Sequence, residues 1–278
     1  MKTKFCFSLT FPLAILLLLT GNLSAQHVGH NNGFIPEVGQ KGKDVVWVPS
    51  PQELISVMFS MAKVTPDDYV FDLGSGDGRV VISAAKLGAH ALGIEYNHDL
   101  VELSVRNAEK DGVSSKTEFI EGDLFKCDLS KATVIILFLL PDINKKLRPK
   151  LLDLKPGTRV VSNTFAMGDW IPDKEMITEE NPNGWNTAYL WIVPAKANGE
   201  WKIGNDILTL KQSYQAVHGW LTSHGITFPV SEGKVNGSSI TFMIDKNLYS
   251  GQVNGEKMIG TRTSEGNISD WEAKKMKP

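Results

Sequence analysis

Cysteine is almost absent from this sequence of 278 residues, which contains only Cys6 and Cys127. It also lacks a surplus of positive charge, because 29 lysines and arginines stand against 31 aspartates and glutamates and give a formal net charge of −2. A protein that follows the phosphates of a nucleic acid needs such a surplus. We therefore expect no nucleic-acid partner.

A long apolar run is missing as well. The run from Phe5 to Leu19 is shorter than the ~20 residues that a membrane-spanning helix needs. It follows two lysines, Lys2 and Lys4, and precedes small and polar residues that end at Ala25, an arrangement typical of a secretory signal peptide. We expect residues 1–25 to be cleaved and the mature protein to be periplasmic or extracellular and free of the membrane. An uncleaved membrane anchor is the alternative.

Cleavage of this leader changes the charge and the cysteine count. It leaves 27 of the 29 basic residues against 31 acidic ones, so the mature net charge is −4. It also removes Cys6, and an internal disulfide is then impossible because only Cys127 is left.

The mature chain is long enough for two domains. Residues 26–44 are rich in glycine, asparagine and histidine, which predicts a flexible lead-in. Its histidines, His27 and His30, are expected to be solvated, and no metal site is predicted. We place an α/β domain at residues 45–194 and an antiparallel β domain at residues 195–278.

The first domain alternates strand and helix patterns. Ser50-Pro51-Gln52-Glu53 matches a capping box and predicts a helix from Pro51 to about Ala62. Strands separated by helices indicate a doubly wound, Rossmann-like parallel sheet with the ligand at the carboxyl ends of its strands. Tyr189–Val193 is expected to be an antiparallel edge strand. The five expected parallel strands are Tyr69–Leu73, His90–Glu95, Thr117–Glu121, Thr133–Leu140 and Thr158–Asn163.

The second domain has a β-type pattern with a Val-x-Gly unit repeated every 18 residues, at Val217, Val235 and Val253. Asn-Gly pairs favour tight hairpins, so the repeat predicts a small antiparallel meander or partial barrel. We expect its core to contain the three tryptophans of the domain, because a small sheet needs large side chains to bury enough apolar area. These are Trp201, Trp220 and Trp271.

The stretch Tyr69–Arg79 contains the strongest functional signal. A β-type run ends in three glycines, Gly74, Gly76 and Gly78, and a helical pattern follows at once. Glycines are needed where the backbone turns tightly and a polar ligand lies against it near a helix N-terminus. A dinucleotide-binding motif would have a third glycine at the position of Arg79, so the spacing argues against NAD.

Acidic residues follow the next two strands. Glu95, 19 residues after Gly76, can accept hydrogen bonds from ribose hydroxyls, and Asp123 with Leu124 can contact adenine. With Asp72 for the amino-acid end, they match S-adenosylmethionine, which we predict as the cofactor. The predicted cofactor-binding residues are Asp72, Gly74, Ser75, Gly76, Glu95, Tyr96, Asp123 and Leu124.

The motifs Val-Phe-Asp-Leu-Gly-Ser-Gly-Asp-Gly-Arg, Gly-Ile-Glu-Tyr-Asn and Glu-Gly-Asp-Leu-Phe resemble those of class I, seven-β-strand S-adenosylmethionine-dependent methyltransferases. More narrowly, Pro49–Trp170 resembles the non-SET protein lysine methyltransferases. The resemblance includes the segment Leu-Lys-Pro-Gly-Thr-Arg-Val-Val-Ser-Asn-Thr-Phe-Ala. The resemblance implies a seven-stranded methyltransferase sheet and a methyltransferase activity.

The segment after the fourth strand departs from many members of the superfamily. Enzymes that methylate amide or base nitrogens carry Asn/Asp-Pro-Pro-Tyr/Phe there, whereas this chain has Phe138-Leu139-Leu140-Pro141. An apolar channel suits a primary amine, which needs positioning and desolvation. A protein lysine is therefore the expected acceptor, and a small molecule is the alternative.

No general base stands out, so the catalytic residues are left unassigned, with Asp142, Asp169 and Tyr96 as candidates by position. The rival function is a non-catalytic exported binding module on a methyltransferase-like fold, in which the β domain binds a ligand or a protein. The sequence does not specify an oligomeric state.

Overall fold

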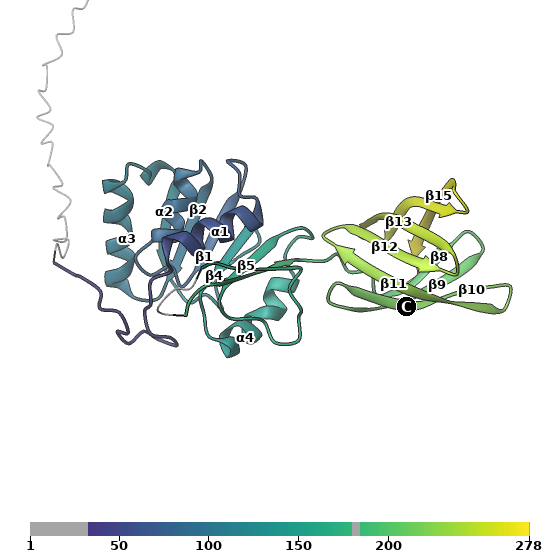
Figure 1. Ribbon diagram of the computed structural model, residues 1–278, viewed down its shortest axis with the longest axis horizontal. Coiled ribbons are helices and arrows are strands. Elements are labelled where there is room, and N and C mark those ends of the chain that lie inside the picture. The colour runs from purple at the N-terminus through teal and green to yellow at the C-terminus, as the bar shows by residue number, and fades with distance from the viewer. Residues whose placement is uncertain (1–32, 180–183, 278) are drawn as a thin grey trace, which may run out of the picture. The chain divides into compact units, whose positions relative to one another are not determined.

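The structure, a computed structural model, describes residues 33–179 and 184–277 (Figure 1). The predicted leader and the first residues of the lead-in therefore lie outside the described residues. Among the residues that are described, no helix combines the length and the apolar character needed to cross a membrane. An α/β sheet domain is followed along the chain by an antiparallel barrel, which confirms the predicted fold class.

A seven-stranded sheet forms the first domain, in the order β3-β2-β1-β4-β5-β7-β6. The first five strands are parallel, and β7 runs antiparallel to both of its neighbours. The strands are β1 (Tyr69–Leu73), β2 (His90–Glu95), β3 (Thr117–Glu121), β4 (Val134–Leu137), β5 (Arg159–Asn163), β6 (Lys174–Ile177) and β7 (Thr187–Ile192).

The predicted antiparallel strand exists as β7, but its placement at the edge was wrong. β7 lies between β5 and β6, and β6 forms the edge. The sequence did not reveal β6 because all four of its residues are exposed, so it carries no alternation of apolar and polar positions.

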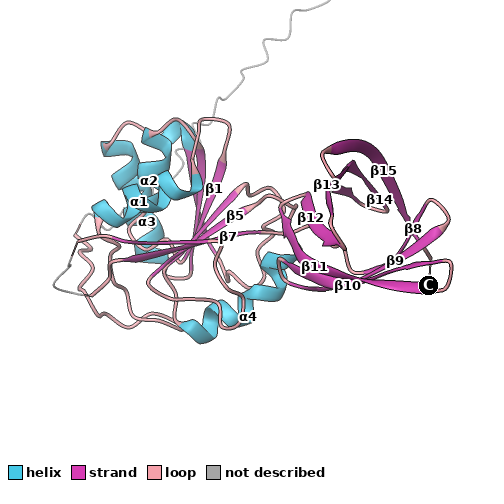
Figure 2. Cartoon of the chain, turned by 45° about the vertical axis from the view of Figure 1, so that its right-hand side comes forward, coloured by secondary structure: helices cyan, strands magenta, loops and turns pink. Residues whose placement is uncertain are grey.

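Helices cover both faces of this sheet (Figure 2). The apolar core on one face joins α1 and α2 to β-strand residues such as Val70 and Val134, and the core on the other face joins α4 to Phe71 and Ile135. Successive strand residues thus point to opposite faces, and both faces are buried, as expected for a parallel sheet. The helices are α1 (Gln52–Ala62), α2 (Arg79–Lys86), α3 (His98–Lys110) and α4 (Pro141–Leu152), with a short 3₁₀ turn at Ser114–Lys116.

The capping box predicted for α1 does not form. Pro51 is the N-cap residue, and no side chain caps the helix. Ser50 is buried, and its hydroxyl instead accepts a hydrogen bond from Asn163 Nδ2 at 3.2 Å. The tertiary contact to the end of β5 has replaced the local one.

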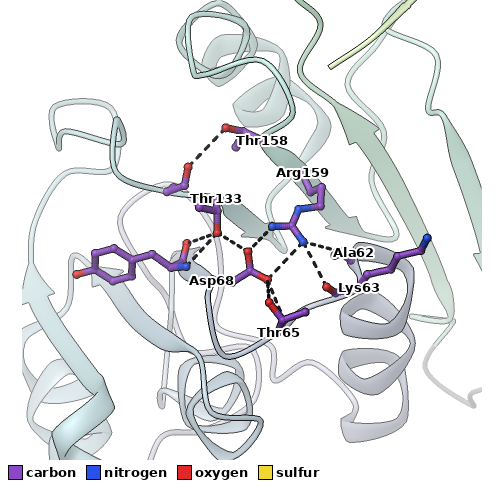
Figure 3. Close-up of polar contacts among 9 residues, drawn as sticks. Ala62, Lys63, Thr65, Asp68, Thr133, Thr158 and Arg159 are labelled. Carbon is purple, nitrogen blue, oxygen red and sulfur yellow. Dashed lines mark hydrogen bonds and ion pairs between the residues drawn. The ribbon is translucent and has the colours of Figure 1, made fainter. Parts of the chain in front are cut away.

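A polar network anchors the amino end of β1 (Figure 3). The buried carboxylate of Asp68 accepts hydrogen bonds from the Arg159 guanidinium, from Thr133 Oγ1 at 2.7 Å and from the Thr65 backbone N–H at 2.8 Å. Arg159 Nη1 also donates to the Ala62 carbonyl at 2.7 Å, at the end of α1. The network therefore ties α1, β1, the residue before β4, and β5 together.

Eight antiparallel strands form the second domain, a closed barrel in the order β10-β11-β12-β13-β14-β15-β8-β9. Each strand pairs with its sequence neighbour, and β15 closes the barrel on β8. The strands are β8 (Gly199–Ile203), β9 (Asp206–Ser213), β10 (Ala216–Ser223), β11 (Ile226–Asn236), β12 (Ser239–Ile244), β13 (Asn247–Asn254), β14 (Lys257–Ser264) and β15 (Asn267–Lys275).

The 18-residue repeat is only partly a series of hairpins. Gly237 and Gly255 occupy turns between strands, whereas Gly219 lies inside β10, where a Cβ would come within 1.9 Å of the Thr209 carbonyl oxygen. Gly219 is thus needed for close strand approach. Of the predicted core tryptophans, Trp201 and Trp271 are buried, but Trp220 is 38% exposed and was wrongly assigned to the core.

Candidate functional site

A pocket opens at the carboxyl ends of β1, β2 and β4, where the glycine turn connects β1 to α2. All three glycines have left-handed backbone angles, with φ of 83° at Gly74, 55° at Gly76 and 79° at Gly78. A Cβ at Gly78 would lie 2.8 Å from Ser104 Cβ, which is closer than a real contact. The turn needs glycine both for its conformation and for its packing against α3.

Glu95, the last residue of β2, is held rigidly beside this turn. Its Oε2 accepts a hydrogen bond from the Gly76 backbone N–H at 2.9 Å. Its Oε1 accepts two more, from Tyr96 N–H at 2.8 Å and Asn97 N–H at 2.9 Å. Three backbone donors therefore fix one carboxylate, which is positioned to accept further hydrogen bonds from hydroxyl groups of a ligand.

Asp72 lines the same pocket and is 5% exposed. Burial, followed by the nearby negative charges of Glu95 and Asp77, raises the pKa of its carboxyl group to about 8. Among the described residues, no group donates a hydrogen bond to this carboxyl. An unpaired buried carboxyl at a ligand site suits a cationic ligand, which would stabilise the ionised form.

Asp123 carries an ion pair. The Lys43 ammonium lies 3.0 Å from Asp123 Oδ2 and 4.5 Å from the centre of the Tyr96 ring. The hydrogen bond from Lys43, followed by that from the Phe125 N–H, lowers the pKa of Asp123. Lys43 thus joins residues 40–48, which we call the strap, to the adenine end of the predicted site.

The strap also reaches the glycine turn. A Cβ at Gly76 would come within 2.5 Å of Trp47 Nε1, so the indole ring packs directly on bare backbone. Sequence reasoning identified neither Lys43 nor Trp47 as part of the site, and it assigned Lys43 to the flexible lead-in. The available signal was the apolar run Val45–Val48, which contains Trp47 but gives no indication of the distant residues that it contacts.

All eight residues predicted to bind the cofactor line this one pocket. The Ser75 side chain is turned toward β2: a Cβ at Gly93 would meet Ser75 Oγ at 2.6 Å, and this hydroxyl has no hydrogen-bond partner among the described residues. Ser75 therefore presents backbone rather than its hydroxyl to the pocket. Contact of these residues with a cofactor is still a prediction.

The candidate bases do not converge on the pocket. Arg148 Nη1 lies 2.5 Å from Asp169 Oδ1 and is the main cause of the lowered pKa of Asp169. Asp142 is exposed and lies 3.4 Å from Lys145 Nζ. Of the three candidate bases, only Tyr96 lines the pocket, so the geometry assigns no general base. Within residues 33–179 and 184–277, no cluster of three or more metal-ligating side chains occurs.

Comparison with known proteins matches the ANTKMT methyltransferase domain family to residues 72–174, from β1 to the start of β6. A protein-lysine N-methyltransferase of Saccharolobus islandicus is 43% identical over 152 residues, which cover 54% of this chain and 94% of that protein. The adenine nucleotide translocase lysine N-methyltransferase of Mus musculus is 35% identical over 130 residues, 46% of this chain and 56% of that one. The chain thus spans little more than half of the second relative.

A solved structure is similar over the same share of the chain. It is described as an RNA methyltransferase from Salinibacter ruber in complex with S-adenosylhomocysteine, and it is 46% identical with a TM-score of 0.51. The match covers 54% of this chain and 95% of that one. The glycine turn, the fixed Glu95 carboxylate and the unpaired Asp72 fit such a cofactor, which carries a ribose and, at its amino-acid end, an ammonium group.

Proposed function

This chain belongs to the class I S-adenosylmethionine-dependent methyltransferases of the protein-lysine type, and on that premise we propose that it methylates the ε-amine of a lysine in a protein. The observation that carries the proposal is the apolar segment after β4. Phe138 and Leu139 line the cofactor pocket, and their side chains offer no hydrogen bond to a planar base or amide. A primary amine does not need one.

The chain's own residues would hold the cofactor and keep water out. Glu95 would accept hydrogen bonds from the ribose hydroxyls, Asp72 would face the ammonium group of the amino-acid end, and Asp123 with Leu124 would border the adenine. S-adenosylmethionine would supply a methyl group bound to a sulfonium sulfur. The neutral amine nitrogen would attack the methyl carbon in line with the carbon–sulfur bond, which would break and leave its electron pair on sulfur. With no base assigned, the amine must lose its proton to water before transfer, and apolar surroundings favour the neutral amine.

RNA is the competing acceptor, because the Salinibacter ruber protein is described as an RNA methyltransferase. Two features of this chain favour a protein. Its charge is slightly negative, whereas RNA binding draws on cationic surfaces. The segment after β4 is also apolar, whereas a base is usually recognised through hydrogen bonds to its edges.

The experiment uses methyl-tritiated S-adenosylmethionine, purified protein and an extract from cells that lack this protein. We expect label in a protease-sensitive fraction that yields methyl-lysine on hydrolysis, and none with Glu95→Ala. Label that is removed by ribonuclease would contradict the proposal, as would an absence of label combined with no heat of cofactor binding at millimolar concentration in calorimetry.

We also propose that residues 1–25 direct export, so that the protein acts outside the cytosol. The pattern of two lysines, an apolar run and small residues supports this. Mass spectrometry of the protein from its native cells tests it. An N-terminus near Gln26 is expected, and an intact Met1 or Lys2 terminus in a cytosolic fraction would contradict it.

A further inference from the structure

A second pocket adjoins the cofactor pocket and is built differently. Strap valines and three aromatic rings line it, and Phe138 and most of the strap line both pockets. The two pockets therefore meet at Phe138. The lining of the second pocket is Lys41, Gly42, Lys43, Asp44, Val45, Val46, Val48, Phe138, Leu140, Phe165 and Trp185.

The three rings form a cluster that we call the aromatic wall: Phe138 after β4, Phe165 after β5 and Trp185 before β7. The ring centres lie 6.2 Å apart for the two phenylalanines, and 5.5 and 5.8 Å from Trp185. Each side chain is only partly buried, and none belongs to the three apolar cores that the described residues form. Three large rings thus contact one another at a pocket surface without serving a core.

The backbone that presents Phe165 is strained. Thr164 has φ of 60°, an unusual value for a β-branched residue. Its N–H donates to the Thr187 carbonyl at 2.6 Å, and the buried Asn144 donates to the Phe165 carbonyl at 3.0 Å. Strain that the surroundings hold in place is found where a side chain must be aimed for function. Here the strained residue, Thr164, immediately precedes Phe165, which belongs to the aromatic wall.

The charged residues that line the second pocket are exposed. Lys43 is paired with Asp123, and the exposed Lys41 and Asp44 carry opposite charges. Apart from Gly42, the other residues of the lining carry valine, leucine or aromatic side chains. Such a surface gains free energy from a straight aliphatic chain but offers no partner to the polar edge of a base.

We propose that the second pocket is the slot for the acceptor lysine, whose four methylenes lie between the strap valines and the aromatic wall with the amine at Phe138. This inference rests on the proposed function. Phe165 and Trp185 are then positioning residues for the substrate, and they are separate from the residues that hold the cofactor.

Alkylamine binding to the full-length protein tests the slot without any methyl transfer. The protein is labelled with 5-fluorotryptophan and saturated with S-adenosylhomocysteine, and the ¹⁹F signal of Trp185 is assigned by its loss in Trp185→Phe. Ethylamine, propylamine, butylamine and pentylamine are titrated in turn. We expect a saturable shift of that signal and an affinity that rises about fourfold per methylene.

Equal affinity for the four alkylamines would contradict the proposed slot, as would a Trp185 signal that does not shift on their addition. Adenosine monophosphate that bound the cofactor-saturated protein more tightly than pentylamine would identify the wall as a stacking surface for bases and would also overturn it. Normal cofactor binding in the same sample shows that such a failure concerns the slot rather than the cofactor site.

Kinetics give a second measurement. Trp185→Ala should raise KM for the lysine acceptor at least tenfold and leave S-adenosylhomocysteine affinity unchanged, and Trp185→Phe should recover most of the loss. The matched control is Trp220→Ala in the barrel, which removes a partly exposed tryptophan that lines neither pocket. An unchanged KM in Trp185→Ala would contradict the proposal.

Discussion

The two ends of β1 hold aspartates in opposite states. At the amino end, Asp68 accepts hydrogen bonds from Arg159, Thr133 and Thr65 (Figure 3). At the carboxyl end, four residues later, Asp72 is equally buried but has no donor among the described residues. One end of the strand is fully paired, and the other keeps an unpaired carboxyl beside the glycine turn.

The pKa values follow this difference. Burial acts to raise the pKa of Asp68, but the hydrogen bonds from Arg159 and Thr133 outweigh it, so the pKa lies below its usual value. Burial dominates at Asp72 and raises the pKa to about 8. The ionised Asp68 therefore stabilises the fold above pH ~4 and loses this effect as the pH falls. The raised pKa of Asp72 instead lowers the stability of the ligand-free fold as the pH rises from ~4 to about 8, because the unfolded chain gives up this proton more readily than the fold does. The amino end is built for stability and the carboxyl end for a ligand.

Breaking the paired end should have the largest effect. Asp68→Ala leaves the Arg159 guanidinium and the Thr133 hydroxyl without their acceptor, which costs about 3 kcal/mol of unfolding free energy. Thermal denaturation should show a fall in Tm of roughly 6–10 °C. The control is Asp67→Ala, which removes the exposed neighbouring carboxylate and should change stability by less than ~0.5 kcal/mol. Equal effects of the two variants would contradict the anchoring role.

A change at Glu95, which ends β2 beside the carboxyl end of β1, should affect binding more than stability. Glu95→Gln replaces one carboxylate oxygen with an NH₂ group. The side chain can then no longer accept hydrogen bonds from the backbone N–H groups of Gly76, Tyr96 and Asn97 all at once. Affinity for S-adenosylhomocysteine, measured by calorimetry, should fall about 100-fold because charged hydrogen bonds are lost. Glu121→Gln, at the exposed end of β3, should leave the affinity unchanged. A similar loss in both variants would mean that Glu95 has no special part in the site.

The parts of the molecule that the sequence predicted are those with local signals. Alternating strand and helix patterns gave the parallel sheet, and glycines and acids at successive strand ends gave eight residues that share one pocket. The strap escaped prediction because the contact of Lys43 with Asp123 spans 80 residues. The same holds for Trp185, which meets Phe138 only through folding, and for barrel closure, which pairs β15 with β8.

The unpaired carboxyl can be examined without a mutation. The ammonium group of the ligand pairs with the ionised form of Asp72, so with a free-protein pKa of about 8 binding must release a proton at neutral pH. Affinity for S-adenosylhomocysteine should rise up to about tenfold from pH 6 to pH 7 and level off near pH 8. Calorimetry at pH 7 in buffers of different ionisation enthalpy should detect the release of nearly one proton. Asp72→Asn should abolish this release, and a proton released equally by the variant would assign it to another group.

The smallest expected effect is the change that Asp72→Asn makes in the free energy of unfolding. This effect also separates the two ends of β1 most clearly. Asp72→Asn removes a buried charge that has no partner, so the ligand-free variant should gain about 1 kcal/mol above pH 8, the gain being small because the amide also lacks a partner. Between pH 6 and pH 9 the stability of the parent protein in urea should decline more than that of the variant. Asp68→Asn should instead lower the stability, because Arg159 then loses a charged acceptor. If both exchanges destabilised the protein alike, β1 would have two structural ends, and the unpaired state of Asp72 would have no link to ligand binding.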